Sequence, residues 1–242
     1  MVDHAPDSTL VLGRILDDRH SARSRAVLNE IPNSRIRILY EVYQEVQSVI
    51  EKKAEFALAY TQNAYLEVAK SKGIDPANLG WDDMPEILSK ARTLAHGRNE
   101  GFFDGMDAFI DFVRQNMAYR PYDSLRLAYL NIVMTNKEKI RTTFGAQKIE
   151  QILVSETTVE EDEVRNNVES LIRTNIPSLE GKKRERDLRI ICQLFACSKR
   201  AHESTFNFII IEKQMKSEMP SVLPLVTEKL GDRIGQVTVQ NA

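Results

Sequence analysis

Arginine and tyrosine side chains that could bind nucleic acid stand together in one short segment, Met117-Ala118-Tyr119-Arg120-Pro121-Tyr122, and Arg126 follows closely. A guanidinium can hold a phosphate through two parallel hydrogen bonds, and an aromatic ring offers a face on which a base can stack. The alternative is that Arg120 forms an ion pair with an acidic side chain at this corner. The residues alone leave both interpretations open.

Three clusters of basic residues could contact phosphate, although each one alone is also typical of a solvated surface. The first comprises Arg120, Arg126, Lys137, Lys139 and Arg141, the second Lys182, Lys183, Arg184, Arg186 and Arg189, and the third Arg14, Arg19, His20, Arg23 and Arg25. The predicted RNA-binding residues are Tyr119, Arg120, Tyr122, Arg126, Lys137, Lys139, Arg141, Lys182, Lys183 and Arg184.

The sequence contains no catalytic signature. Histidines stand at positions 4, 20, 96 and 202, with no H-E-x-x-H spacing, no cysteine at zinc-ligand spacing and no glycine-rich phosphate loop. We therefore expect no enzyme, no metal, no cofactor and no small-molecule substrate. An enzyme would need a site assembled from distant residues, such as His96 or His202 with carboxylates, because geometry and not sequence order defines such a site.

The composition is that of a soluble globular protein: of 242 residues, 42% are hydrophobic and 28% are charged, and the net charge is -2. This charge provides no global attraction for nucleic acid, but a local basic surface is compatible with it. Cys192 and Cys197 lie in an apolar helical pattern, which predicts buried thiols and not a disulfide or metal pair. With no signal-peptide pattern and no apolar run of about 18 to 20 residues, we expect an intracellular protein without a membrane partner.

Helical periodicity runs through most of the chain. Apolar residues recur at spacings of three and four from Ser34 to Lys72, which predicts one long helix that stops at Gly73. Asp75-Pro76 is typical of a helix cap followed by proline. A further aromatic-rich helix should end near Asn116, before the corner.

After the corner, Asp123 or Ser124 should cap a second helix, and the capping box Thr135-x-x-Glu138 should open a third. Another capping box, Thr158-x-x-Glu161, predicts a helix in the C-terminal part. The pattern there assigns Phe206 and Ile209 to Ile211 to a helix. Pro220 and Pro224 should interrupt the structure near its end, and a last short helix should stop at Gly231.

These patterns predict an all-α, two-lobed helical core with flexible N- and C-terminal arms. The expected divisions are an N-terminal arm at 1–33, a helical core lobe at 34–154, a second helical lobe at 155–232 and a C-terminal tail at 233–242. The N-terminal arm is either flexible or docks on a neighbouring copy through a short apolar turn. In the tail, Val237 and Val239 alternate with polar residues and either fray or add to a neighbour.

The corner and the helix after it resemble the coat proteins of flexible filamentous plant viruses, the potyvirus type most of all. That family has an aromatic-rich helix, an Ala-Tyr-Met-Pro-Arg-Tyr corner, and a helix that opens Ser-Leu-Ala-Arg and runs to Met-Thr. The counterparts here are residues 117–122 for the corner, Ser124-Leu125-Arg126 through Met134-Thr135 for the helix, and Lys72-Gly73 through Pro76 to Trp81 for the stretch before the family's tryptophan.

The resemblance implies an all-α core that coats single-stranded RNA in a helical filament, with Arg120 as the counterpart of the family's RNA-contacting arginine. Arginine and proline are exchanged at the corner, and the family's aspartate falls on Asn131 or Leu130. The chain continues after residue 155 for longer than the coat proteins of that family do, and in this respect it resembles a two-lobed nucleoprotein of a negative-strand RNA virus.

We therefore expect a viral coat protein or nucleoprotein that self-assembles and encapsidates single-stranded RNA through a basic groove, in the virion and the host cytoplasm. Its expected partners are RNA and further copies of itself. The alternative is an all-α scaffold or adaptor, cytoplasmic and without nucleic acid, because the long amphipathic helix from Ser34 to Lys72 can also bind a partner protein.

Overall fold

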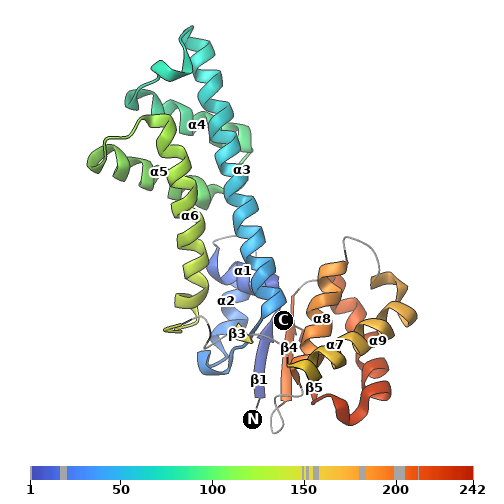
Figure 1. Ribbon diagram of the computed structural model, residues 1–242. Helices are drawn as coiled ribbons and strands as arrows, with labels where there is room; N and C mark the ends of the chain where they lie inside the picture. The colour runs from blue at the N-terminus through green and yellow to red at the C-terminus, as the bar shows by residue number, and fades with distance from the viewer. Residues whose placement is uncertain are drawn as a thin grey trace. The chain divides into compact units, whose positions relative to one another are not determined.

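The computed structural model describes residues 2–16, 21–148, 150, 153–154, 158–179, 184–198, 205–211 and 213–241. Most of these residues are helical, which confirms the all-α prediction for the bulk of the chain, and a small parallel sheet accompanies the helices (Figure 1). The chain forms two compact units, one from Met1–Val46 with Ile140–Ala242 and the other from Gln47–Lys139. This division differs from the expected one, because the first and last segments of the chain belong to the same unit.

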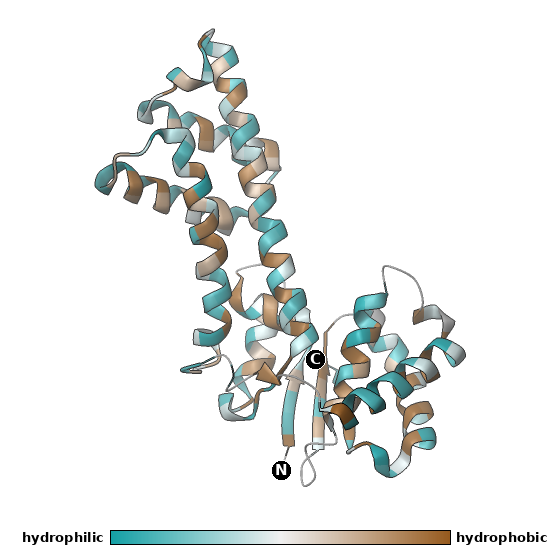
Figure 2. Ribbon diagram, in the orientation of Figure 1, coloured by the Kyte–Doolittle hydropathy of each residue, from teal (hydrophilic) through white to brown (hydrophobic). Residues whose placement is uncertain are grey.

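The unit from Gln47 to Lys139 contains the larger parts of two long antiparallel helices, with shorter helices between them in the chain. Its elements are α3 (Tyr40–Lys72), η2 (Pro76–Asn78), η3 (Trp81–Asp83), α4 (Met84–Ala95), α5 (Glu100–Asn116) and α6 (Pro121–Thr143). Lys137 Nζ on α6 lies 2.5 Å from Glu51 Oε1 on α3, so the C-terminal part of α6 lies beside the N-terminal part of α3. Figure 2 shows hydrophobic and hydrophilic residues alternating along these helices, as expected where one face is buried.

Several helix ends lie where the sequence predicts them. Gly73 follows α3 with a φ of +66°, a left-handed conformation that glycine adopts readily. Asp75 Oδ1 accepts a hydrogen bond from Ala77 N–H at 2.7 Å. In the other unit, Glu161 N–H donates to Thr158 Oγ1 at 3.3 Å and Thr158 N–H donates to Glu161 Oε2 at 2.8 Å, so the predicted capping box is confirmed.

α6 is one uninterrupted helix, so the predicted cap at Asp123 or Ser124 and the predicted new helix at Thr135 are wrong. Helical structure already begins at the proline of the corner, because a first helical residue needs no N–H donor within the helix. Ile132 and Ile140 are both buried. Burial of this face keeps the helix continuous through a segment that also fits a capping box.

Within its described residues, the other unit contains a parallel sheet in the strand order β1-β4-β5. The strands are β1 (Val2–Pro6), β4 (Thr205–Ile210) and β5 (Val237–Asn241). Phe208 in the central strand aligns with Ala5 on one side and Val239 on the other. A second, two-residue parallel pair joins β2 (Ile38–Leu39) to β3 (Leu153–Val154).

The prediction of a helix around Phe206 and Ile209 to Ile211 is wrong, because this segment is the central strand β4. Phe206, Phe208 and Ile210 are buried and share one face of the strand. A short apolar run of this kind fits a strand or a helix equally well, and the two flanking strands decide the outcome. The tail predicted to fray or to add to a neighbour forms β5, beside β4 of the same chain.

Helices surround this sheet, and α8 and α9 pack directly on it (Figure 1). The helical elements of the unit are α1 (Ser8–Ile15), α2 (Ser21–Asn29), η1 (Asn33–Arg35), α7 (Val159–Asn175), η5 (Pro177–Leu179), α8 (Glu185–Ser198), α9 (Lys213–Leu230) and η6 (Gly231–Arg233). Leu10, Val11 and Leu28 are buried. The N-terminal segment, predicted to be a flexible or exchanged arm, therefore packs within its own chain over the described residues.

Asp7 connects three elements of this unit. Its side chain is 2% exposed. Oδ1 accepts a hydrogen bond from Leu10 N–H at 2.8 Å and thereby caps α1, while Oδ2 accepts one from Ile211 N–H at 2.7 Å, directly after β4. Asp7 N–H also donates to Ile209 O at 2.9 Å. One carboxylate thus holds the end of β1, the start of α1 and the end of β4 together.

α9 continues through Pro220 and Pro224, which were predicted to interrupt the structure, and it ends directly before Gly231, where the last helix was predicted to stop. Both prolines are exposed, so water can bond the carbonyl groups that lose an intrahelical partner. Met219, Val222 and Val226 are buried on the opposite side. Packing of this apolar face outweighs the two missing N–H donors.

Cys192 and Cys197 in α8 are buried and form no disulfide, which confirms the prediction of buried thiols. Burial raises the pKa of Cys192 to about 12. Among the described residues, none of the helices is long and apolar enough to cross a bilayer.

Candidate nucleic-acid interface

The predicted corner is an exposed link between α5 and α6. α5 ends where Met117 N–H donates to Val113 O at 2.9 Å, and residues 117–120 have no regular structure. Arg120 O accepts a hydrogen bond from Ser124 N–H at 3.1 Å, so its backbone occupies the position just before α6. Arg120 lies outside a helix, because proline disfavours the helical conformation at the residue before it, and the Arg120 side chain is exposed.

The two tyrosines of the corner keep about half of their surface accessible. Tyr119 is 47% exposed and Tyr122 is 48% exposed. The Tyr122 ring meets the Tyr65 ring edge-on, with 5.2 Å between centroids and 65° between planes. Tyr65 is buried, its hydroxyl donates to Pro76 O at 3.1 Å, and burial raises its pKa. Tyr122 thus packs against a buried ring and keeps about half of its surface accessible to a partner.

Arg120 and Arg126 are both exposed, and among the described residues neither guanidinium has an ion-pair or hydrogen-bond partner. The alternative in which Arg120 pairs with an acidic side chain at the corner is therefore wrong. Arg126 follows Tyr122 by four residues, so the two side chains are neighbours on the surface of α6. We name Tyr119, Arg120, Tyr122 and Arg126 the corner site.

The other members of the first basic cluster lie at the far end of α6 and are engaged within the chain. Lys137 forms its ion pair with Glu51. Lys139 Nζ donates to the amide oxygen of Asn136 at 3.2 Å. Arg141 Nη1 donates at 2.8 Å to each of two backbone carbonyl groups that follow the helix. From Arg126 to Lys137 the helix rises by about 16 Å at 1.5 Å per residue, so the cluster does not form one site.

The second basic cluster is also not an open surface in the described part of the chain. Lys182 and Lys183 lie outside the described residues. Arg184 is only 8% exposed, and it forms ion pairs with Glu218 and with Asp187, the latter at 3.3 Å. Its assignment to the RNA site is therefore corrected: Arg184 is a buried cation whose carboxylate partners lie on α8 and α9.

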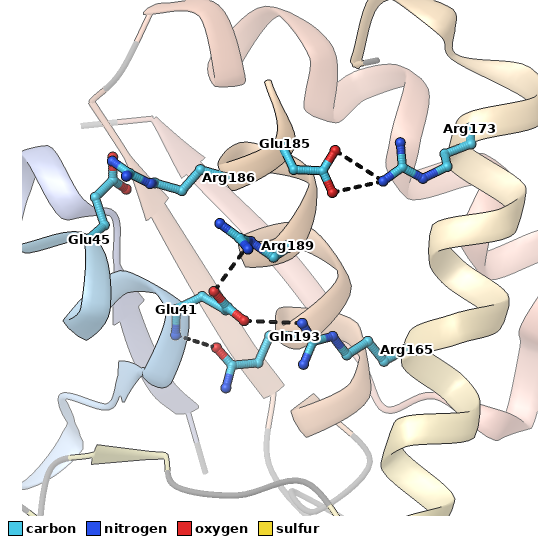
Figure 3. Close-up of polar contacts among 8 residues, drawn as sticks. All are labelled: Glu41, Glu45, Arg165, Arg173, Glu185, Arg186, Arg189 and Gln193. Atoms are coloured by element: carbon cyan, nitrogen blue, oxygen red, sulfur yellow. Dashed lines mark hydrogen bonds and ion pairs between the residues drawn. The ribbon is translucent and has the colours of Figure 1, made fainter. Parts of the chain in front are cut away.

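Arginines of α7 and α8 contact the first turns of α3, which belong to the same compact unit (Figure 3). The Glu41 carboxylate lies between two guanidinium groups, 3.1 Å from Arg165 Nη2 and 3.6 Å from Arg189 Nε. Glu41 N–H donates to Gln193 Oε1 at 2.8 Å, which supplies an acceptor for the first turn of α3. Three contacts therefore hold one residue of α3 against α7 and α8.

Two more ion pairs extend this network. Arg186 Nη1 lies 3.2 Å from Glu45 Oε1, and Arg173 Nη2 donates to both carboxylate oxygens of Glu185 at 2.8 and 3.1 Å (Figure 3). The arginines of the second cluster are thus neutralised by glutamates, chiefly from α3. Local sequence patterns miss this pairing, because residues such as Glu41 and Arg165 lie 124 positions apart.

The third, N-terminal cluster is only partly described. Arg19 and His20 lie outside the described residues. Arg14 is in the last turn of α1, where a cation favours the helix dipole. Arg23 and Arg25 are exposed on α2, and each has a further interaction within the chain. None of these residues belongs to the corner site.

Among the described residues, no group of three or more His, Cys, Asp and Glu side chains is arranged to hold a metal ion. His96 is the exposed C-cap of α4 with a φ of 52°. His4 is half-buried, and its Nδ1 lies 3.2 Å from Asn207 Nδ2. His202 lies outside the described residues. His96 thus ends a helix, and His4 contacts a side chain of the neighbouring strand.

No protein-family model, curated protein or solved structure matches this chain. The resemblance to viral coat proteins and nucleoproteins therefore stays a prediction. The corner site is defined by its own geometry: two unpaired guanidinium groups beside two half-exposed tyrosine rings.

Proposed function

We propose that this protein coats single-stranded RNA as a self-associating viral coat protein or nucleoprotein, and that the corner site contacts the RNA. The observation that supports the proposal is the pair of exposed arginines, Arg120 and Arg126, which have no acidic partner among the described residues. Phosphates of an RNA strand would neutralise these two cations, and the half-exposed rings of Tyr119 and Tyr122 would receive base faces.

The chemistry of the corner site favours a single strand over a duplex. In a duplex the base faces are stacked on one another, so a tyrosine ring cannot reach them without unstacking a base pair. In a single strand both base faces are available. The proposed contact is therefore independent of sequence, and its affinity falls as salt concentration rises.

The experiment is a titration of fluorescently labelled oligouridine with wild-type protein and with the double variant Arg120→Ala/Arg126→Ala, over a series of salt concentrations. Each phosphate contact to a single strand contributes about 0.7 to the slope of log K against log salt. The double variant should therefore bind about tenfold or more weakly at low salt, with a slope shallower by about 1.4.

The matched control is Arg98→Ala, which removes an exposed arginine from the link between α4 and α5 in the same compact unit. This variant should bind as the wild type does. No RNA binding by the wild type at low salt would refute the proposed function. Unchanged affinity and slope in the double variant would reject the corner site as the RNA contact.

A protein-interaction scaffold is the second candidate, because large apolar side chains are exposed on the helices of the Gln47–Lys139 unit. They are Phe56 at 59%, Leu66 at 53%, Leu130 at 49% and Met134 at 66% exposed. Apolar side chains on a helix surface can bind a partner protein. The ratio of absorbance at the nucleic-acid and protein maxima distinguishes the two candidates: a coat protein is purified with nucleic acid, whereas a scaffold is not.

A further inference from the structure

The two edges of the parallel sheet differ, and the edge formed by β1 is protected. Because Asp7 N–H donates to β4, alternation along β1 directs the backbone groups of His4 and Pro6 away from β4. His4 O accepts a hydrogen bond from Arg37 N–H at 2.8 Å, and Ile36 forms a bridge with His4. Pro6 has no N–H to offer. This edge is therefore closed to another strand.

The edge formed by β5 is open. Phe206 N–H donates to Gln236 O at 2.9 Å, so the alternation along β5 directs the backbone groups of Val237, Val239 and Asn241 away from β4. In the part of the chain that the structure describes, no strand pairs with this side of β5. Unpaired N–H and C=O groups along an edge are a template for another strand.

The side chains of this segment do nothing to prevent such pairing. Open edges are commonly protected by charged side chains, proline or a bulge. Residues 234–242 contain no Lys, Arg, Asp, Glu or Pro, in a chain of which 28% is charged. Val237, Thr238 and Val239 are β-branched, which favours the extended conformation. The segment therefore has the composition of a pairing strand.

We propose that β5 pairs antiparallel with β5 of a second copy of this chain across a twofold axis, which joins the two sheets into one. The inference names a surface for the self-association in the proposed function and rests on that part of it. A head-to-tail pairing of β5 with β1 of another copy is excluded by the closed β1 edge. In a twofold pairing, β5 of one copy lies antiparallel to β5 of the other, so only the open edge of each copy is used.

The polar side chains of β5 suit this pairing. Asn207 Oδ1 accepts a hydrogen bond from Thr238 Oγ1 at 3.0 Å, and Asn207 Nδ2 donates to Gln240 Oε1 at 2.8 Å. With the axis at Val239, Thr238 of one copy lies opposite position 240 of the other. The row of hydroxyl and amide groups then continues across the junction, with no like charges opposed.

The experiment is analytical ultracentrifugation of RNA-free protein, for the wild type and for Val239→Pro. Proline at position 239 removes an outward N–H in each copy and leaves the hydrogen bonds to β4 in place. The wild type should form dimers, and the variant should dimerise about 10- to 100-fold more weakly. The control Val239→Ala keeps the N–H and should dimerise within about threefold of the wild type.

Asn241→Pro is a second variant of the same kind at the end of the strand, and circular dichroism checks that each variant is folded. A wild type that is monomeric up to about 100 µM would overturn the inference. So would folded proline variants that both dimerise as the wild type does. Binding of a short oligouridine to the same proteins separates the two proposals: a monomeric wild type that still binds RNA rejects the β5 surface alone, whereas a dimeric wild type that binds no RNA rejects the proposed function.

Discussion

Replacement of Asp7 by alanine should destabilise the unit that contains the sheet by about 2–4 kcal/mol. The carboxylate is 2% exposed and accepts two hydrogen bonds, from Leu10 N–H at 2.8 Å and Ile211 N–H at 2.7 Å. A hydrogen bond to a charged group contributes about 1.5–3 kcal/mol, and we reduce the sum for the two bonds to about 2–4 kcal/mol because Ile211 is partly accessible to water.

A second variant, Asp7→Asn, separates the contributions of the two hydrogen bonds. Asparagine has nearly the size of aspartate and keeps one acceptor oxygen, which can still cap α1 at Leu10. Its NH2 group then faces Ile211 N–H, a donor opposite a donor, so the bond to the end of β4 is lost. We therefore expect a loss of about 1–2 kcal/mol, intermediate between the wild type and the alanine variant.

The assay is urea unfolding followed by far-UV circular dichroism, together with hydrogen exchange at the Leu10 and Ile211 amides. The matched control is Asp232→Ala, an exposed carboxylate in η6 of the same unit, which should change stability by less than about 0.5 kcal/mol. If Asp7→Ala behaves like this control, or if both amides keep their protection, the role given to Asp7 is refuted.

Three other outcomes test the packing of the same unit. Burial lowers the pKa of His4 below 6.5, and the charge of Asp3 opposes this shift in part. The unfolded chain therefore binds a proton at His4 more readily than the folded chain does, so stability falls as the pH decreases through 6.5. His4→Gln should therefore flatten the dependence of urea stability on pH between about 7 and 5, and an unchanged slope would contradict the burial. The Cys192 thiol, with a pKa of about 12, should not react with Ellman's reagent before unfolding, and rapid labelling of the native protein would refute its burial. Glu41→Gln should cost about 1–2 kcal/mol of stability in urea because two arginines lose their partner, whereas Glu45→Gln, facing one arginine, should cost less; equal losses would contradict the network.

The sequence by itself determined the features that depend on neighbours along the chain. The helical class, the stop at Gly73, the cap at Asp75 and the capping box at Thr158 are all in place. Hydrogen bonds within a helix and at its ends join residues about four positions apart, so a local pattern contains both partners. The exposed corner at Arg120 was predictable for the same reason, since proline acts on the residue directly before it.

Tertiary structure decided the features whose partners are distant in the chain. Phe206 to Ile210 is a strand because residues 2–6 and 237–241 flank it, and no periodicity within the segment shows this. Arg184 and Arg189 looked like surface cations, but carboxylates on other helices neutralise them. A charged side chain is available to a ligand only if folding places no opposite charge beside it. Lys137 and Arg184 pair with carboxylates, whereas Lys139 and Arg141 donate to amide or carbonyl oxygens. Arg120 and Arg126 have no such partner among the described residues, and only the folded chain reveals this difference.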